Sequence, residues 1–174
     1  MWYNWGMKRF LMISLVMGLT VVMSLAGVPA MAASEAQEQG VKENCDTIKE
    51  VLKNVQKDDA RARVYLGAYY EAILSNFITP LNVRLVENNL SEASLVENQN
   101  KFAAARSLFV DDYVSYQQRL EELVAMDCKT KPKEFYEKLE KVRQKRKVVE
   151  QDALKIRGLT SEHVKLVEQL KGKV

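Results

Sequence analysis

The two cysteines of the chain, Cys45 and Cys128, lie at the outer ends of two long helical patterns, and this arrangement constrains the fold most strongly. Within residues 41–76 and again within 95–123, apolar residues recur alternately every three and four positions, which predicts two long helices with buried faces. The turn-forming residues 88–91 lie about halfway between the cysteines. The sequence therefore predicts a helical hairpin whose closure brings the cysteines side by side.

A third helical pattern follows the hairpin. It begins near Pro132, because proline fits the first turn of a helix, and its apolar residues keep the same spacing over 135–156. Gly158 is predicted to end this helix, and Thr160 to cap a short last one. No sustained alternation of apolar and polar residues predicts a strand. The predicted fold over 44–174 is all-α: an elongated antiparallel three-helix bundle, or coiled-coil hairpin, with a short fourth C-terminal helix.

The first helix contains two residues that disfavour a helix interior. Gly67 is predicted to let a neighbouring helix or a bulky tyrosine approach closely. Pro80 lacks a backbone donor and predicts either a kink or a stop and restart. A kink is favoured, because Phe77, Leu81 and Leu85 continue the apolar stripe across the proline. Outside the main row, Val51, Tyr65 and Ala72 widen the stripe, as expected for a helix that contacts more than one partner.

The N-terminal residues have the layout of a secretory signal peptide over residues 1–32. Lys8 and Arg9 precede an apolar run over 10–26, and Ala30-Met31-Ala32 fits the small-x-small cleavage rule. The alternative is an uncleaved membrane anchor, since the apolar run is nearly long enough to span a bilayer. Residues 33–43 are polar and small, and predict a disordered leader. The expected location is extracytoplasmic: periplasmic, cell-surface or secreted, with no transmembrane segment in the mature chain.

Charge argues against a general affinity for nucleic acid. Cleavage would remove Lys8 and Arg9 from 26 basic residues and leave 24 against 23 acidic ones, a net charge of +1. The segments differ, however, because residues 92–127 are net acidic and residues 131–157 net basic. A solvated face is the usual meaning of such a basic run. The alternative is a binding face built on Arg143, Lys145, Arg146 and Lys147.

Two cysteines in an exported protein usually pair, so a Cys45–Cys128 disulfide is predicted. Free buried thiols or a metal site are the alternatives, but His163 is the one further soft ligand that the chain offers. Pairing the cysteines sets the hairpin register. It places Arg61 opposite Asp112 and Arg63 near Asp111, a predicted charge match between the two helices.

The sequence offers little catalytic chemistry. The single histidine, His163, is expected to face solvent in the first turn of the last helix. The acidic pairs 58–59 and 111–112 lack the Glu-x-x-His spacing of metal-binding bundles. No nucleophile elbow, zinc-helix motif or phosphate-binding loop is present. We therefore expect no enzyme activity, no catalytic or metal-binding residues and no cofactor.

A group of aromatic residues is the most distinctive feature of the hairpin. It is expected to form an aromatic belt midway along the two helices and to pack in the core, and it comprises Tyr65, Tyr69, Tyr70, Phe102, Phe109, Tyr113 and Tyr116. The alternative to core packing is that Tyr70, which lies off the main row, contributes to a partner surface, where tyrosine is favoured.

These features predict an exported, non-enzymatic helical module of the cell envelope or exterior, which acts by binding a protein partner or by self-assembly. Two alternatives remain open at this point. One is a periplasmic holdase-like chaperone, and the other is a helical bundle that binds a small ligand.

Overall fold

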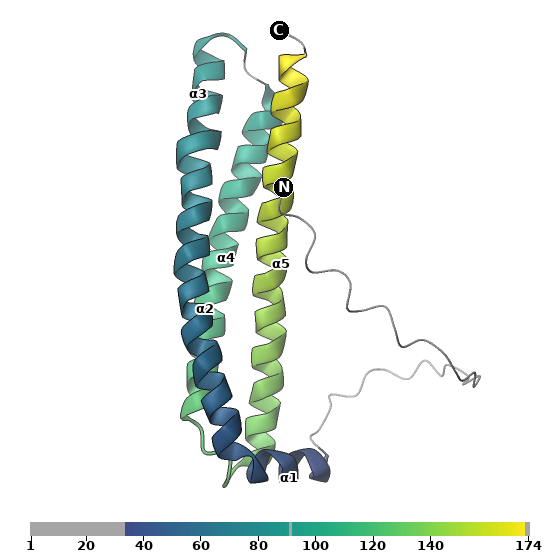
Figure 1. Cartoon of the computed structure of the whole chain (residues 1–174). Helices are drawn as coiled ribbons and strands as arrows, with labels where there is room; N and C mark the ends of the chain where they lie inside the picture. Colours follow the sequence, from purple (N-terminus) through teal and green to yellow (C-terminus); the bar gives the residue numbers. More distant parts are fainter. Residues whose placement is uncertain (1–33, 91, 173–174) are drawn as a thin grey trace, which may run out of the picture. The chain divides into compact units, whose positions relative to one another are not determined.

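We describe residues 34–90 and 92–172 of a computed structural model. They belong to the second of two units into which the chain divides, Met1–Met31 and Ala32–Val174. The predicted signal peptide over 1–32 lies outside the described residues. The described residues form helices joined by short turns, and no strand occurs among them. The predicted all-α class is therefore confirmed (Figure 1).

The unit consists of five α-helices and one π-helical turn. In chain order these are α1 (Glu35–Glu43), α2 (Cys45–Ile73), η1 (Leu74–Ile78), α3 (Thr79–Glu87), α4 (Ala93–Ala125) and α5 (Pro132–Lys171). Segments α2, η1 and α3 follow one another without a break and form the first long arm. The turn after α3 contains Asn89 with φ of 58°, the left-handed conformation that asparagine tolerates.

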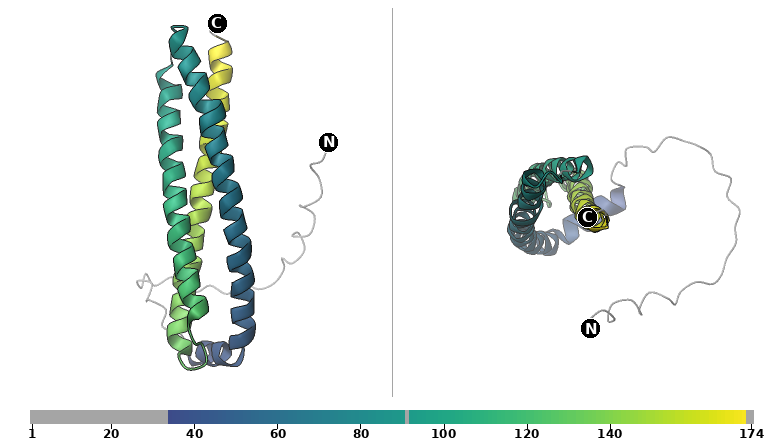
Figure 2. Two further views of the ribbon diagram at one scale, coloured as in Figure 1. Left: turned by 90° about the vertical axis from the view of Figure 1, so that its left-hand side faces the viewer. Right: turned by 90° about the horizontal axis from the view of Figure 1, so that it is seen from above.

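Helix α4 is the centre of the packing, because it contacts both α2 and α5 (Figure 2). It runs antiparallel to each of them (Figure 1). Its buried row keeps the three-and-four spacing along its whole length, and comprises Leu95, Asn98, Phe102, Ala105, Phe109, Tyr113, Tyr116, Leu120 and Leu123. Burying this row of large side chains removes a continuous apolar surface from water and is the main stabilising contribution to the unit.

The C-terminal part of the chain differs from the prediction. Helix α5 runs through Gly158 without interruption, so the expected short fourth helix is wrong. The buried residues Phe135, Val142, Val149, Ile156 and His163 are seven positions apart, so one heptad pattern continues through the glycine. Packing of this row against α4 outweighs the roughly 1 kcal/mol by which an interior glycine disfavours a helix. The same continuity buries His163, which was expected to face solvent.

The first arm crosses Pro80 by means of a π turn, which shifts the buried face by one residue. Ile78 and Asn82 are buried, whereas Phe77 is 68% exposed. The predicted stripe is therefore wrong at Phe77, whereas Leu81 and Leu85 are half-buried. A π turn accommodates one extra residue in the helix, and proline next to it cannot donate an ordinary helical hydrogen bond. Spacing alone could not reveal the shift.

Two further predictions, one about the residues before α2 and one about α2 itself, need correction. The expected disordered leader contains α1, which has a capping box between Ser34 and Gln37 and buries Val41. Gln37 Nε2 also donates to Tyr136 Oη of α5 (2.8 Å). Gly67 does not serve a close approach, because a Cβ there would meet nothing within 4 Å.

The hairpin register is close to the predicted one, but its charge partners are different. Lys49 Nζ donates to the Met126 carbonyl (3.1 Å), as the disulfide register requires. Arg61 pairs within its own helix, with Asp58 (3.7 Å). Asp112 pairs with Lys145 of α5 (2.5 Å). The predicted Arg61–Asp112 pair is therefore not formed, because Lys145 of a third helix binds Asp112 and Arg61 binds Asp58 of its own helix.

No helix among residues 34–90 and 92–172 combines the length and apolar character needed to cross a membrane.

Candidate functional site

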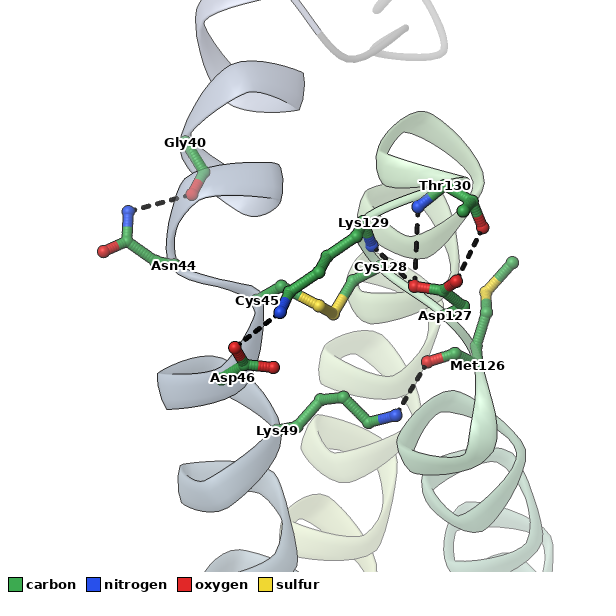
Figure 3. The surroundings of a disulfide bond; sticks show 10 residues. All are labelled: Gly40, Asn44, Cys45, Asp46, Lys49, Met126, Asp127, Cys128, Lys129 and Thr130. Atoms are coloured by element: carbon green, nitrogen blue, oxygen red, sulfur yellow. Dashed lines mark hydrogen bonds and ion pairs between the residues drawn. A yellow bond between two sulfur atoms is a disulfide. The ribbon is translucent and has the colours of Figure 1, made fainter.

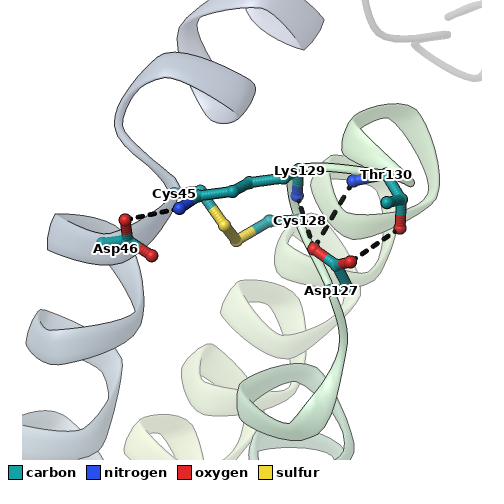
Figure 4. Close-up of polar contacts among 6 residues, drawn as sticks. All are labelled: Cys45, Asp46, Asp127, Cys128, Lys129 and Thr130. Atoms are coloured by element: carbon teal, nitrogen blue, oxygen red, sulfur yellow. Dashed lines mark hydrogen bonds and ion pairs between the residues drawn. A yellow bond between two sulfur atoms is a disulfide. The ribbon is translucent and has the colours of Figure 1, made fainter.

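The predicted cysteines lie together at the base of the helical unit. Cys45 begins α2 and Cys128 lies in the loop between α4 and α5, with Cα atoms 5.6 Å apart in a disulfide (Figure 3). Both residues are buried. Beside them Lys129 Nζ forms an ion pair with Asp46 (2.6 Å), so a second contact joins the same two segments (Figure 4). The base is thus fastened covalently and electrostatically.

The loop that carries Cys128 is ordered by its own side chains. Asp127 Oδ1 accepts the backbone N–H of Lys129 (2.9 Å), and its Oδ2 accepts the Thr130 hydroxyl (2.9 Å) (Figure 4). These hydrogen bonds hold the pKa of the Asp127 carboxyl below its ordinary value. The turn therefore holds Cys128 in a defined position in the loop that precedes α5.

Above the base, a groove runs between α2 and α5, and α4 forms the floor of its central part. The central part has a volume of about 680 Å³, with Phe109, Tyr113 and Tyr116 on its floor. A pocket of about 410 Å³ lies next to α1 and includes Val41. A second pocket of about 410 Å³ lies towards the other end and includes Tyr69. We call these three spaces together the α2–α5 groove. Its shape follows from the packing, because α2 and α5 each pack on α4.

Beside the groove, α2 has a row of side chains that are exposed, except for Val55 and Ala62, which are half-buried. These residues again follow the three-and-four spacing, and we call them the outer seam: Val51, Val55, Asp58, Ala62, Tyr65 and Tyr69. Val51, Tyr65 and Tyr69 are 56%, 69% and 51% exposed. Scattered apolar side chains are normal on a protein surface, but an ordered row of them indicates a contact surface.

An aromatic chain connects the outer seam to the core. Tyr65 stacks on Tyr69, with ring centroids 6.4 Å apart, and Tyr69 contacts Tyr70 at 5.9 Å. Tyr70 then meets Phe109 edge-on at 5.2 Å, and Phe109 meets Tyr113 at 5.4 Å. The predicted aromatic belt therefore exists, but the alternative considered for Tyr70 is wrong. Tyr70 is buried, and Tyr65 and Tyr69 are the exposed members.

Asp59 organises the middle of the groove. Its carboxylate accepts the Tyr116 hydroxyl (2.6 Å) and pairs with Arg146 of α5 (3.0 Å). Its backbone carbonyl accepts the Tyr113 hydroxyl (2.5 Å). Burial, followed by the charge of Asp59, raises the pKa of Tyr113 to about 12. Burial and the hydrogen bond to Asp59 raise the pKa of Tyr116 as well. Both phenols are therefore neutral donors at physiological pH. Through these contacts Asp59 of α2 connects to α4 and to α5.

The basic face considered for α5 is largely used inside the unit. Arg146 pairs with Asp59, Lys145 with Asp112 and Arg143 with Glu140 of its own helix. Of the four basic residues considered, Lys147 is the one without an ion pair in the described part of the chain. These pairings favour the interpretation that the basic run of α5 balances acids of the neighbouring helices.

The acidic pairs 58–59 and 111–112 do not come together as a di-carboxylate site. Asp112 instead lies against Asp152 of α5, and burial together with this contact raises the pKa of Asp152. Lys145 holds the pKa of Asp112 below its ordinary value. Within the described ranges, no group of three or more His, Cys, Asp or Glu residues is arranged to hold a metal ion.

The end of the unit opposite the disulfide contains three buried polar residues, Asn82, Asn98 and His163. Asn82 Nδ2 donates to Gln99 Oε1 (2.6 Å), and Asn98 Nδ2 donates to the Leu159 carbonyl (3.2 Å). His163 Nδ1 is buried without a hydrogen-bond partner, and burial lowers the pKa of its imidazole. At this end, therefore, buried polar atoms of all three residues lack a hydrogen-bond partner.

A His163→Leu variant is expected to be more stable than the native chain, by about 1–3 kcal/mol, because it removes a buried unpaired polar atom. The difference should grow as pH falls. The unfolded histidine, with a pKa of about 6.5, binds more protons than the folded one, so native stability is lost as pH drops below that value. Urea unfolding at pH 8 and pH 5 measures this, and Lys165→Gln is the matched exposed control. An equal gain at both pH values would contradict the expectation.

No protein-family model, no curated protein and no solved structure gives a significant match to the chain. The interpretation of function therefore depends on the groove, the outer seam and the Cys45–Cys128 disulfide.

Sequence analysis missed the outer seam as a unit. Its residues share positions with the buried row of α2, so the two rows merge into one wide stripe in the sequence. The available signal was the second heptad spacing through Val51, Asp58 and Tyr65, which lie seven residues apart.

Proposed function

We propose that the chain acts outside the cytoplasm as an elongated, non-enzymatic three-helix bundle that binds a protein partner through the α2–α5 groove. The observation that carries this proposal is the one-sided packing of α2. Its inner row packs on α4, while Val51 and Tyr69, which line the groove, and the neighbouring Tyr65 remain more than half exposed. A fourth helix laid against this wall would complete the bundle in the way that helix-in-groove complexes do.

The groove is suited to binding rather than to catalysis. Its central acidic and basic side chains, Asp59 and Arg146, are engaged in a pair that holds α2 and α5 together across the groove. Its floor is aromatic, and tyrosine and phenylalanine provide large contact areas at protein interfaces. The buried Cys45–Cys128 disulfide supports an oxidising compartment, where such bonds persist.

The groove can be filled by a substitution on α5. Ala153 of α5 lines the central and outer parts of the groove, so Ala153→Trp would fill it. Gln151→Trp is the matched control, because Gln151 is exposed and lines none of the three spaces. With the purified mature protein immobilised, a specific protein from the native envelope fraction should bind to the wild type and to Gln151→Trp, and be lost with Ala153→Trp.

Two results would overturn this proposal. One is retention of the same protein by Ala153→Trp. The other is suppression of the aggregation of unrelated unfolded proteins to the same extent by all three forms, which would favour a holdase that does not depend on the groove.

A further inference from the structure

We propose that the outer seam of α2 binds the outer seam of a second copy of this chain, with the two α2 helices antiparallel. This inference rests on the proposed function, because it names the partner that covers the exposed wall of the groove. Three properties of the seam support it: its spacing, the order of its residues and its central charges.

The spacing is that of a coiled coil. Helix α2 has two heptad rows that share Val55, Ala62 and Tyr69, and the inner row packs on α4. A row of six positions spaced by three and four residues fits another helix that crosses at a shallow angle. The outer seam extends over 18 residues, about 27 Å of helix at 1.5 Å per residue. It therefore offers a long, narrow contact suited to one further helix.

The order of residues makes the seam complementary to itself when reversed. Small aliphatic side chains, Val51 and Val55, occupy one end, and tyrosines occupy the other. An antiparallel pair centred near Ala60 would place Val51 against the partner's Tyr69 and Val55 against the partner's Tyr65. Each large ring then meets a smaller side chain, and two-fold symmetry repeats every contact. A parallel pair would instead set tyrosine against tyrosine and valine against valine.

The charges at the centre of the seam favour the same orientation. Asp58 and Arg61 are three residues apart, and their side chains are 73% and 70% exposed. In an antiparallel pair Asp58 approaches the partner's Arg61, and the reciprocal contact forms on the other side of the axis. In a parallel pair Asp58 would meet the partner's Asp58, and like charges in contact are unfavourable. The sign pattern therefore selects a second copy in reversed orientation.

The first test is the molecular mass of the purified mature protein, measured by sedimentation equilibrium across a range of concentrations. We expect a monomer–dimer equilibrium. Tyr65→Glu should weaken the dimer on the order of tenfold or more, since it places a charge against the apolar Val55 of the partner copy. The matched control is Val64→Glu, because Val64 is 67% exposed but lies outside the seam. This control should leave the dimer unchanged.

A charge exchange tests the orientation. Asp58→Arg alone and Arg61→Asp alone should each weaken the dimer, because each sets like charges against the partner. The Asp58→Arg, Arg61→Asp double variant should restore it. Circular dichroism at the same concentrations checks that each variant remains helical. If a glutamate variant unfolds, the charge exchange tests the dimer without it.

The inference is overturned by a protein that stays monomeric, by a dimer that responds equally to Tyr65→Glu and Val64→Glu, or by failure of the double variant to restore association. The proposed function fails separately. A monomer that still captures an envelope protein in a manner blocked by Ala153→Trp would refute the dimer and support the groove as a binding site for a different protein.

Discussion

A Cys45→Ser, Cys128→Ser double variant is expected to lose roughly 4–5 kcal/mol of unfolding free energy under oxidising conditions. The bond closes a separation of 83 residues, and in the loop-entropy model such a constraint destabilises the unfolded chain by this amount. For a domain of ordinary stability this is a large share of the total. The melting temperature and the urea midpoint should therefore both fall.

The loss should also be uneven within the unit. Helix α2 has one packed face and an exposed groove side, whereas α4 has helices on two sides. Hydrogen exchange should accordingly rise most in α2 and least in α4. The control is the wild type whose disulfide has been reduced under unfolding conditions and which is then refolded and kept reduced. Its melting temperature and hydrogen exchange should match those of the double variant. A double variant that melts at the wild-type temperature in oxidising buffer would contradict this prediction.

A Phe109→Ala variant is expected to lose about 3–5 kcal/mol, the usual range for removing a fully buried phenylalanine. Phe109 is 1% exposed and links two aromatic neighbours, Tyr70 at 5.2 Å and Tyr113 at 5.4 Å. Its removal leaves a cavity beneath the groove floor and removes the edge-to-face contacts of both rings. Chemical unfolding of the variant measures the loss.

Leu108 provides the matched control for this substitution, because it is adjacent in sequence and 49% exposed. Leu108→Ala should change stability by no more than about 0.5 kcal/mol. Similar losses in the two variants would mean that the aromatic chain is not the centre of the core. A loss in Phe109→Ala that is accompanied by weaker partner binding would connect the floor of the groove to its function.

The sequence was sufficient to predict the features that depend on local pattern and covalent chemistry. The three-and-four spacing identified both arms of the hairpin, and the position of the turn between Cys45 and Cys128 identified their pairing. The turn predicted over residues 88–91 contains Asn89, which adopts the left-handed conformation that asparagine tolerates. These features are local or follow from one distance constraint, so they do not require knowledge of how three helices share their faces.

Tertiary packing decided the features for which local preference and long-range burial compete. Gly158 disfavours a helix locally, but burial of Ile156 and His163 on one heptad row keeps α5 continuous. The π turn before Pro80 exchanges Phe77 for Ile78 in the core, and no spacing rule contains that shift. Asp112 pairs with Lys145 of α5 and not with the expected Arg61, and Asp59 pairs with Arg146, because a third helix supplies both bases. The outer seam of α2 depends on tertiary packing for the same reason: the positions of the neighbouring helices determine which row of α2 stays exposed.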